Sequence, residues 1–412
     1  MPRATSMLRR FPASVSRRPG ATGCPHRSPR RSPTDRAHRR TTGGSMRITE
    51  IEIRACSPGN VGDAVDGARL SGGTAPEVVV ISMKTDEGIT GVSFGSGGLD
   101  ARVTARAFAQ VRPFFLGRDP MAREQNATEF RWFDRRWNHS PIYAYGPFDI
   151  ASWDIAGLRA GLPIHQLIGT AAERRAVYVS SMFLDTPEQY AAQALEVKAR
   201  GFRGYKVHPP GPAAVDLEVY AAVREAVGSE FALMADPVAT HSYEEALRVG
   251  RVLESLGYLW FEEPVYDYDV QSLIKLTNKL DIPIAGTETI AGGSHLTAQF
   301  IASGAVDIVR TDPSWRGGIT SSLKTAHTAE AFGLTCELHT ALYHPLELAN
   351  LHTSLAISNT GWFELLYPTE DFDFGLAEPL DIRDGYAYAP DAAGLGAVYD
   401  WDAIDDATVE LV

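Results

Sequence analysis

Seven ionisable residues recur at a nearly constant spacing through the second half of the chain. Each closes a short apolar run: His208, Asp236, Glu262, Glu288, Asp312, His339 and Glu364. Neighbouring members of this series are 28, 26, 26, 24, 27 and 25 positions apart. Such a distance is typical of one strand followed by one helix, so each repeat delivers one polar group to the same edge of a parallel sheet. The spacing therefore predicts a catalytic face.

Three carboxylates on consecutive runs, Asp236, Glu262 and Glu288, predict a metal site. Like charges that converge repel each other, and burial adds a further penalty, so three acids cannot meet without a counter-charge. A hard divalent cation resolves that conflict. Ligands that are all oxygen favour Mg²⁺, with Mn²⁺ as a substitute, whereas Zn²⁺ more often recruits His or Cys.

The elements that must position these groups are short strands alternating with helix-length segments from about residue 174 onward. The expected strands are residues 177–179, 204–208, 232–236, 259–263, 284–288, 307–312, 334–339 and 362–365. Eight strands separated in this way favour a closed barrel over an open sheet. A doubly wound sheet would usually carry a Gly-rich phosphate turn after an early strand, and the sequence has none.

The preceding part of the chain has the pattern of an antiparallel sheet. Residues 48–53 alternate, a Gly-rich stretch covers 57–74, and apolar runs at 78–83 and 90–94 flank a turn at 86–88. Helical periodicity follows, including residues 150–160. We expect an α+β domain over residues 46–170, a barrel over 171–380, and a segment over 381–412 that returns to the first domain.

The first 45 residues are rich in Arg, Pro, Ser and Gly and have no hydrophobic period, so we expect disorder. They lack the apolar core of a secretory signal. A transit peptide, a nucleic-acid-binding arm and a misassigned start all remain open. We favour the last, because Met46 directly precedes a strand-like run.

Charge, hydropathy and cysteine content exclude several classes of protein. The chain has a net charge of −12, and the tail's +10 leaves −22 for the remainder, which disfavours nucleic-acid binding by the folded body. No run approaches the roughly 20 apolar residues of a membrane span. The three cysteines form no C-x-x-C pair, which favours free thiols in a reducing cytoplasm.

Several motifs together resemble the mandelate racemase-like subgroup of the enolase superfamily, over nearly everything after Met46. They are Lys206-Val207-His208, Asp236, Trp260-Phe261-Glu262-Glu263-Pro264, Gly286-Thr287-Glu288, Asp312 with Gly317-Gly318, and His339. The resemblance implies a (β/α)7β TIM-like barrel, an N-terminal α+β capping domain and a homo-oligomer. It also implies that Glu262 rather than Glu263 is the metal ligand, and side-chain alternation along a strand agrees that only one of the pair faces the metal.

The resemblance further implies roles for the remaining polar residues. Asp312 and His339 would form an acid/base dyad in which Asp312 fixes the imidazole tautomer, and Glu364 would hydrogen-bond the substrate carboxylate. Lys206 would orient that carboxylate. His208 occupies the place of the second lysine of a Lys-x-Lys motif; it is either a base on the opposite face or a residue that merely lines the pocket.

Other loop residues have weaker assignments. Val238 lies where relatives often have a polar group, which predicts an apolar wall. His241, Trp315 and Arg316 follow strands and could reach a substrate, but we expect each to be a bystander. The Gly-rich stretch 57–74, with Asp63, Asp66 and Arg69, is expected to cover the mouth of the barrel.

These features predict metal-dependent removal of the proton next to the carboxylate of a small substrate. We favour dehydration of a sugar acid or another hydroxy acid to a 2-keto acid, because by resemblance the subgroup is dominated by acid-sugar dehydratases. In addition, His208 in place of lysine breaks the matched pattern of two bases, a lysine on one face and the Asp312–His339 dyad on the other. A racemase or epimerase of 2-hydroxy acids and a lactone cycloisomerase stay open. A metal-dependent hydrolase barrel is disfavoured by the absence of an early His-x-His, and a non-catalytic carboxylate-binding barrel is a further alternative.

Overall fold

The computed structural model describes residues 45–59 and 76–412. The expectations for the first 44 residues, and those for Asp63, Asp66 and Arg69, therefore lie outside the described residues. Ser45–Val412 forms one compact unit. No helix within the described residues is long and apolar enough to cross a membrane. The domain boundaries that we expect near residues 170 and 380 stay predictions.

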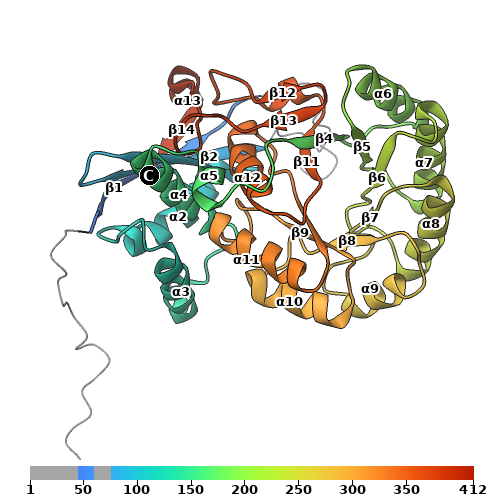
Figure 1. Ribbon diagram of the computed structural model, residues 1–412, viewed down its shortest axis with the longest axis horizontal. Coiled ribbons are helices and arrows are strands. Elements are labelled where there is room, and N and C mark those ends of the chain that lie inside the picture. Colours follow the sequence, from blue (N-terminus) through green and yellow to red (C-terminus); the bar gives the residue numbers. More distant parts are fainter. Residues whose placement is uncertain (1–44, 60–75) are drawn as a thin grey trace, which may run out of the picture. The chain divides into compact units, whose positions relative to one another are not determined.

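An antiparallel sheet opens the fold. Its strands are β1 (Ile48–Cys56), β2 (Glu77–Thr85) and β3 (Thr90–Gly98), and β14 (Thr408–Leu411) at the far end of the chain pairs with β1 (Figure 1). Alternation along β1 and β2 buries one row of side chains, including Ile51, which is opposite Met83. This row packs with aromatic residues of the helices that follow, among them Phe108 and Phe148.

The helices of this first part are α2 (Ala101–Phe115), α3 (Arg123–Phe133), the π-helical turn η2 (Asp134–Asn138), α4 (Gly146–Ala160) and α5 (Ile164–Ile168). Helix α4 is buried along most of its length. Two of its carboxylates bind backbone groups from distant segments: Asp149 accepts from the N–H and hydroxyl of Thr320, and Asp154 accepts from the N–H groups of Val92 and Leu395. These bonds tie the first sheet to the rest of the unit.

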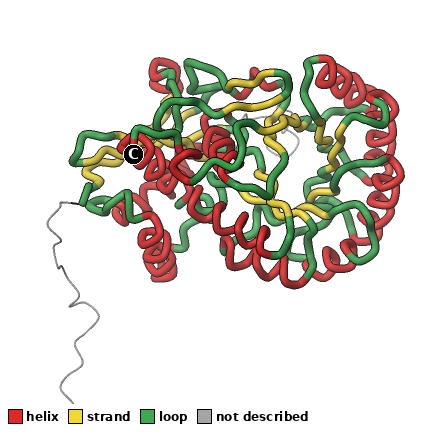
Figure 2. Tube along the Cα trace, in the orientation of Figure 1, coloured by secondary structure: helices red, strands yellow, loops and turns green. Residues whose placement is uncertain are grey.

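Eight parallel strands alternate with helices in the second part. The strands are β4 (Arg175–Ser180), β5 (Gly204–Val207), β6 (Ala232–Ala235), β7 (Phe261–Glu262), β8 (Ile284–Gly286), β9 (Ile308–Thr311), β10 (Thr335–Leu338) and β11 (Trp362–Leu366). The helices between them are α6 (Pro187–Ala199), α7 (Ala213–Val227), α8 (Tyr243–Leu256), α9 (Val270–Thr277), α10 (Gly293–Ser303), α11 (Gly318–Ala331) and α12 (His344–Ala356). Figure 2 shows the strands inside a ring of these helices.

The strands follow the chain order from β4 to β10, and β11 pairs with β4. Between β10 and the residues that lead into β11, the N–H of Cys336 donates to the carbonyl oxygen of Asn359, and the carboxylate of Glu337 accepts from the N–H groups of Gly361 and Trp362. The sheet is thus closed into the predicted (β/α)7β barrel. Between Arg175 and Leu366, all of which are described, seven helices cover eight strands.

The segment after β11 covers the place where an eighth helix would lie. It contains the 3₁₀ turn η3 (Thr369–Phe372), the hairpin of β12 (Asp381–Arg383) and β13 (Tyr386–Tyr388), and α13 (Trp401–Ala407). Strand β13 pairs antiparallel with the start of β4. The chain then reaches β14 in the first sheet.

Candidate active site

Lys206 is the centre of a buried cluster of acids inside the barrel. Its Nζ lies 2.8 Å from Glu364 Oε1, 3.1 Å from Glu262 Oε1 and 3.2 Å from Asp236 Oδ2. Burial alone would lower the pKa of Lys206, but the charges of Glu262, Glu364 and Asp236 outweigh it and raise the pKa well above its usual value. The lysine is therefore a fixed positive charge, so we do not assign it as a base.

Several strands end one residue earlier than predicted, just before the ionisable residue that was expected to close them. His208, Asp236 and Asp312 each follow the last residue of a strand instead of closing it. Each is followed by proline, which has no N–H to extend the ladder. Glu288 lies two residues beyond β8, Glu262 closes β7 as predicted, and Glu364 lies in the middle of β11.

Arg310 belongs to the same cluster and has no role in the sequence prediction. It is fully buried in β9, with Nε 2.8 Å from Glu262 Oε1 and 3.6 Å from Glu288 Oε2, and Nη2 paired with Glu364. Its Nη1 donates to the Tyr178 hydroxyl. A signal was present: an arginine within an apolar strand, two positions before Asp312, shares the face of that aspartate by strand alternation.

Two further acids lack sufficient counter-charge. Glu288 Oε2 accepts no hydrogen bond, and burial followed by the charges of Glu262 and Asp236 raises its pKa well above the usual range. Glu263 is also buried, and burial followed by the charge of Glu288 raises its pKa. The backbone at Glu263 has a φ of 35°, outside the extended conformation, and which of the two glutamates faces the metal stays a prediction.

This electrostatic imbalance fits a divalent cation, and the donors are the oxygens that Mg²⁺ prefers. Asp236, Glu262 and Glu288 are the residues that would hold it. Among the residues that the structure describes, no three such side chains are already grouped closely enough to bind an ion. Lys206 contacts Asp236 and Glu262, and Arg310 contacts Glu262 and Glu288, so ion binding requires the carboxylates to turn toward a common point.

His339, directly after β10, is oriented by Asp312, directly after β9. His339 Nδ1 lies 3.1 Å from Asp312 Oδ2, and the other oxygen of Asp312 accepts from the N–H and hydroxyl of Ser314. This arrangement favours a proton on Nδ1 and leaves Nε2 directed toward the acids, 3.6 Å from Glu288 Oε1. Burial would lower the pKa of His339, but its hydrogen bond to Asp312 and the charge of that carboxylate outweigh burial and raise it.

His208, directly after β5, comes from the far wall of the barrel, since β4 and β11 separate β5 from β10 on one side and four strands separate them on the other. Its Nδ1 lies 2.6 Å from the carbonyl oxygen of Ser181, which requires a proton on Nδ1. Its Nε2 lies 3.1 Å from Asp236 Oδ2. Both ring nitrogens of His208 thus have protein partners.

Of the loop residues with weaker assignments, Trp315 lies beside a proposed catalytic residue, whereas Arg316 and His241 are engaged elsewhere. The Trp315 ring lies 5.2 Å from that of His339, centroid to centroid. Arg316 is buried and donates to the carbonyl oxygens of Thr287 and Gly293, so its guanidinium is already engaged. His241 is buried beside Asp216 of α7. Val238 is exposed.

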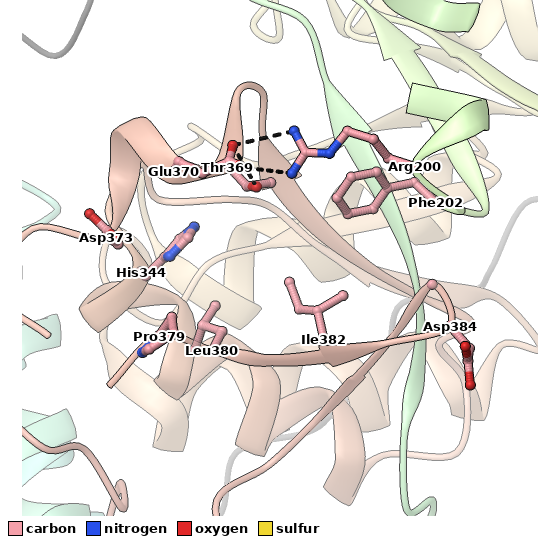
Figure 3. Close-up of a pocket in the computed structure, with 11 residues that line it drawn as sticks. Arg200, Phe202, His344, Thr369, Glu370, Asp373, Pro379, Leu380, Ile382 and Asp384 are labelled. Carbon is pink, nitrogen blue, oxygen red and sulfur yellow. Dashed lines mark hydrogen bonds and ion pairs between the residues drawn. The ribbon is translucent and has the colours of Figure 1, made fainter. Parts of the chain in front are cut away.

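At least four cavities lie outside the acid cluster in the described part of the chain, among them two that border helices flanking the barrel. One of about 590 Å³ is bounded by α3, residues 139–145 and the starts of α10 and α11, with Trp315 on its wall. The other, of about 290 Å³, lies under the segment that replaces the eighth helix. Figure 3 shows it with Arg200 paired to Glu370 and with His344 and Ile382 on its walls. Neither is lined by the predicted metal ligands or acid/base residues.

The comparisons with known proteins agree with this geometry. Residues 189–403 match the enolase C-terminal domain-like family, and residues 62–169 match the mandelate racemase / muconate lactonizing enzyme N-terminal domain. The chain belongs to the enolase superfamily, in its mandelate racemase-like subgroup. The prediction of family and fold is thereby confirmed.

Several relatives of this superfamily member are named as dehydratases. L-talarate/galactarate dehydratase of Salmonella typhimurium is 32% identical over 78% of this chain and 80% of its own length. Arabinonate dehydratase of Saccharolobus solfataricus is 31% identical over 78% of this chain and 87% of its own. The fold is similar to that of D-glucarate dehydratase from Agrobacterium tumefaciens, solved in complex with magnesium, with a TM-score of 0.78 and 33% sequence identity. That match covers 89% of this chain and 100% of the dehydratase chain. A racemase and cycloisomerases also occur among the relatives.

Proposed function

We propose that this enzyme dehydrates a sugar acid or a related hydroxy acid to a 2-keto acid, with Mg²⁺ held by Asp236, Glu262 and Glu288. The observation that carries the proposal is the pair formed by Asp312 and His339, whose free Nε2 is directed at a buried acid cluster. The names of the dehydratase relatives support the same reaction class.

The chemical difficulty is that a carbon acid next to a carboxylate is very weakly acidic. When bound, Mg²⁺ would stabilise the negative charge that develops on the substrate carboxylate. Lys206 offers a buried ammonium to this charge. The proposed hydrogen bond from Glu364 to the substrate carboxylate requires a proton on Glu364, whereas burial, which would raise the pKa of Glu364, is outweighed by the charges of Lys206 and Arg310, which lower it well below its usual value. At present Glu364 accepts from Ser180, Lys206, Arg310 and the N–H of Thr340, so its position is strongly determined.

His339 carries the proton in this proposal. Its neutral Nε2 takes the proton from C2 of the substrate, and Asp312 stabilises the resulting imidazolium. The imidazolium then returns that proton to the hydroxyl leaving C3, so water departs and the enol left behind tautomerises to the 2-keto acid. His339 and His208 are more exposed than the acids around Lys206, with 15% and 14% of their side-chain surface exposed. We accordingly place the substrate between the two histidines and above the acids.

Racemisation or epimerisation is the second candidate, and one observation favours it. His208 and His339 extend from nearly opposite walls of the barrel, which is the arrangement that inversion at one carbon requires. Against it, His208 Nε2 is bound to Asp236, a proposed metal ligand. Dehydration needs only the histidine whose Nε2 is free.

The first test of the proposal concerns the metal. We expect full loss of turnover in a chelator and recovery with Mg²⁺; unchanged turnover in the chelated enzyme would refute the metal assignment. Glu262→Gln should weaken metal binding by more than the roughly 10- to 100-fold that loss of an outer-shell partner costs. Titration calorimetry with Mg²⁺ measures this directly. Glu337→Gln is a suitable control, because Glu337 is also buried but its carboxylate accepts from backbone N–H groups between β10 and β11.

The second test concerns the substrate. A library of mono- and diacid sugars should contain at least one compound that yields a 2-keto acid, detected with a carbonyl reagent. Inversion of a stereocentre in the library without any 2-keto product would replace dehydration by the second candidate.

A further inference from the structure

Arg310 places a permanent positive charge deep inside the barrel. An arginine is rarely fully buried without several partners, and here the guanidinium contacts three carboxylates: Glu262, Glu288 and Glu364. Its remaining donors reach the Tyr178 hydroxyl and the carbonyl oxygen of Leu338. The Nη1 and Nη2 atoms are thus hydrogen-bonded, whereas Nε has only ion-pair contacts, with Glu262 and Glu288, and makes no hydrogen bond.

The contact with Glu262 bears directly on the proposed metal site. Both Arg310 Nε and Lys206 Nζ approach the same oxygen, Glu262 Oε1, and the indole N–H of Trp260 donates to Oε2. Glu262 is thus fully engaged by cations and donors of the protein itself. An incoming metal ion has to compete with these groups for the carboxylate.

The charge count shows what Arg310 contributes. Four carboxylates contact Lys206 or Arg310, namely Asp236, Glu262, Glu288 and Glu364. With all four ionised, the two cations leave a double negative charge, which one divalent ion neutralises. Without Arg310 the same acids would carry a triple negative charge, and the loaded site would remain negative.

We propose that Arg310 is a positioning residue that holds Glu262 and Glu364 in place and lowers the affinity of the site for its divalent ion. The inference rests on the proposed function, since it assumes that these carboxylates bind a metal. Removing a positive charge a few ångströms from a divalent ion strengthens ion binding by Coulomb's law, and the low dielectric of the interior enlarges that effect. A residue with a purely structural role would instead weaken metal binding when it is removed.

The test is a titration of Arg310→Gln and Arg310→Lys with Mn²⁺, followed by electron paramagnetic resonance at one pH for the wild type and both variants. We expect Arg310→Gln to bind Mn²⁺ at least about tenfold more tightly than the wild type, because the positive charge of the guanidinium no longer repels the ion. Arg310→Lys keeps the charge but loses the planar fork, so its affinity should stay within about threefold of the wild type. Equal or weaker binding by Arg310→Gln would overturn the proposal.

Thermal unfolding provides a second readout. The metal-free Arg310→Gln protein should melt at a lower temperature than the wild type, and its gain in Tm on adding Mn²⁺ should exceed that of the wild type.

If Arg310→Gln does not fold, Arg310→Lys alone tests the proposal: an Mn²⁺ affinity that differs from the wild-type value by more than about tenfold would contradict it. If the wild type binds no divalent ion, the proposed function fails. If the wild type binds Mn²⁺ and Arg310→Gln binds no more tightly, only the role of Arg310 fails.

Discussion

The two walls of the barrel present a histidine in opposite ways. On the wall of β9 and β10, His339 is held through Nδ1 by a carboxylate, and Nε2 is left toward the acid cluster. On the wall of β5 and β6, His208 is held through Nδ1 by a carbonyl oxygen, and Nε2 is taken by Asp236. The imidazole of His339 is thus oriented for proton transfer, whereas both ring nitrogens of His208 contact other protein groups.

The difference follows from the partner of Nδ1. A carboxylate stabilises the imidazolium and strengthens the base, whereas a carbonyl oxygen fixes the tautomer without adding a full negative charge. Asp312 can play this part because Ser314 holds its other oxygen and because it is completely buried. A histidine in the site therefore acts as a base only where its ring nitrogen is left available, so the number of histidines does not give the number of bases.

The largest effect should come from His339→Asn. General-base removal costs about 10² to 10⁴ in rate, and dehydration by our proposal loses both its base and its acid in this variant. Product formation should therefore fall below detection. His241→Asn is a matched control, because His241 is a buried histidine beside Asp216, outside the acid cluster. Wild-type turnover by His339→Asn would show that the two walls have been assigned the wrong roles.

Asp312→Asn should give a smaller loss together with a shift in pH dependence. The charge of Asp312 raises the pKa of His339, and the base must be neutral to act, so kcat/KM rises with pH through that pKa. Without the carboxylate the pKa falls. The rising limb should then move to lower pH, while the plateau falls because the base is weaker and its tautomer is no longer fixed. If the rising limb of the kcat/KM profile stays at the same pH in Asp312→Asn, a group other than His339 controls it.

The sequence predicted the barrel and the members of the acid cluster well because strand length and spacing alone bring those residues to one end of the sheet. Family, fold and enzyme class are confirmed, whereas the individual site roles and the homo-oligomer stay predictions. Arg310 was missed because the prediction considered only the polar residues that end the apolar runs, although strand alternation places Arg310 on the same face as Asp312. The contacts of His208 were missed for another reason: Ser181 is 27 positions away in sequence, and the register of β4 against β5 brings its carbonyl oxygen to the imidazole.

The smallest effect on turnover should come from His208→Asn. If His339 alone carries the proton, this variant should keep dehydration within about tenfold of the wild type, since the lost side chain lines the pocket and contacts Asp236 without transferring a proton. The sharper measurement is exchange of the α-proton in deuterated water. Slow exchange that persists in His339→Asn and vanishes in the double variant would show that His208 can reach the substrate from the far wall. Loss of dehydration in His208→Asn comparable to that in His339→Asn would instead make His208 the abstracting base and His339 the acid that expels the hydroxyl.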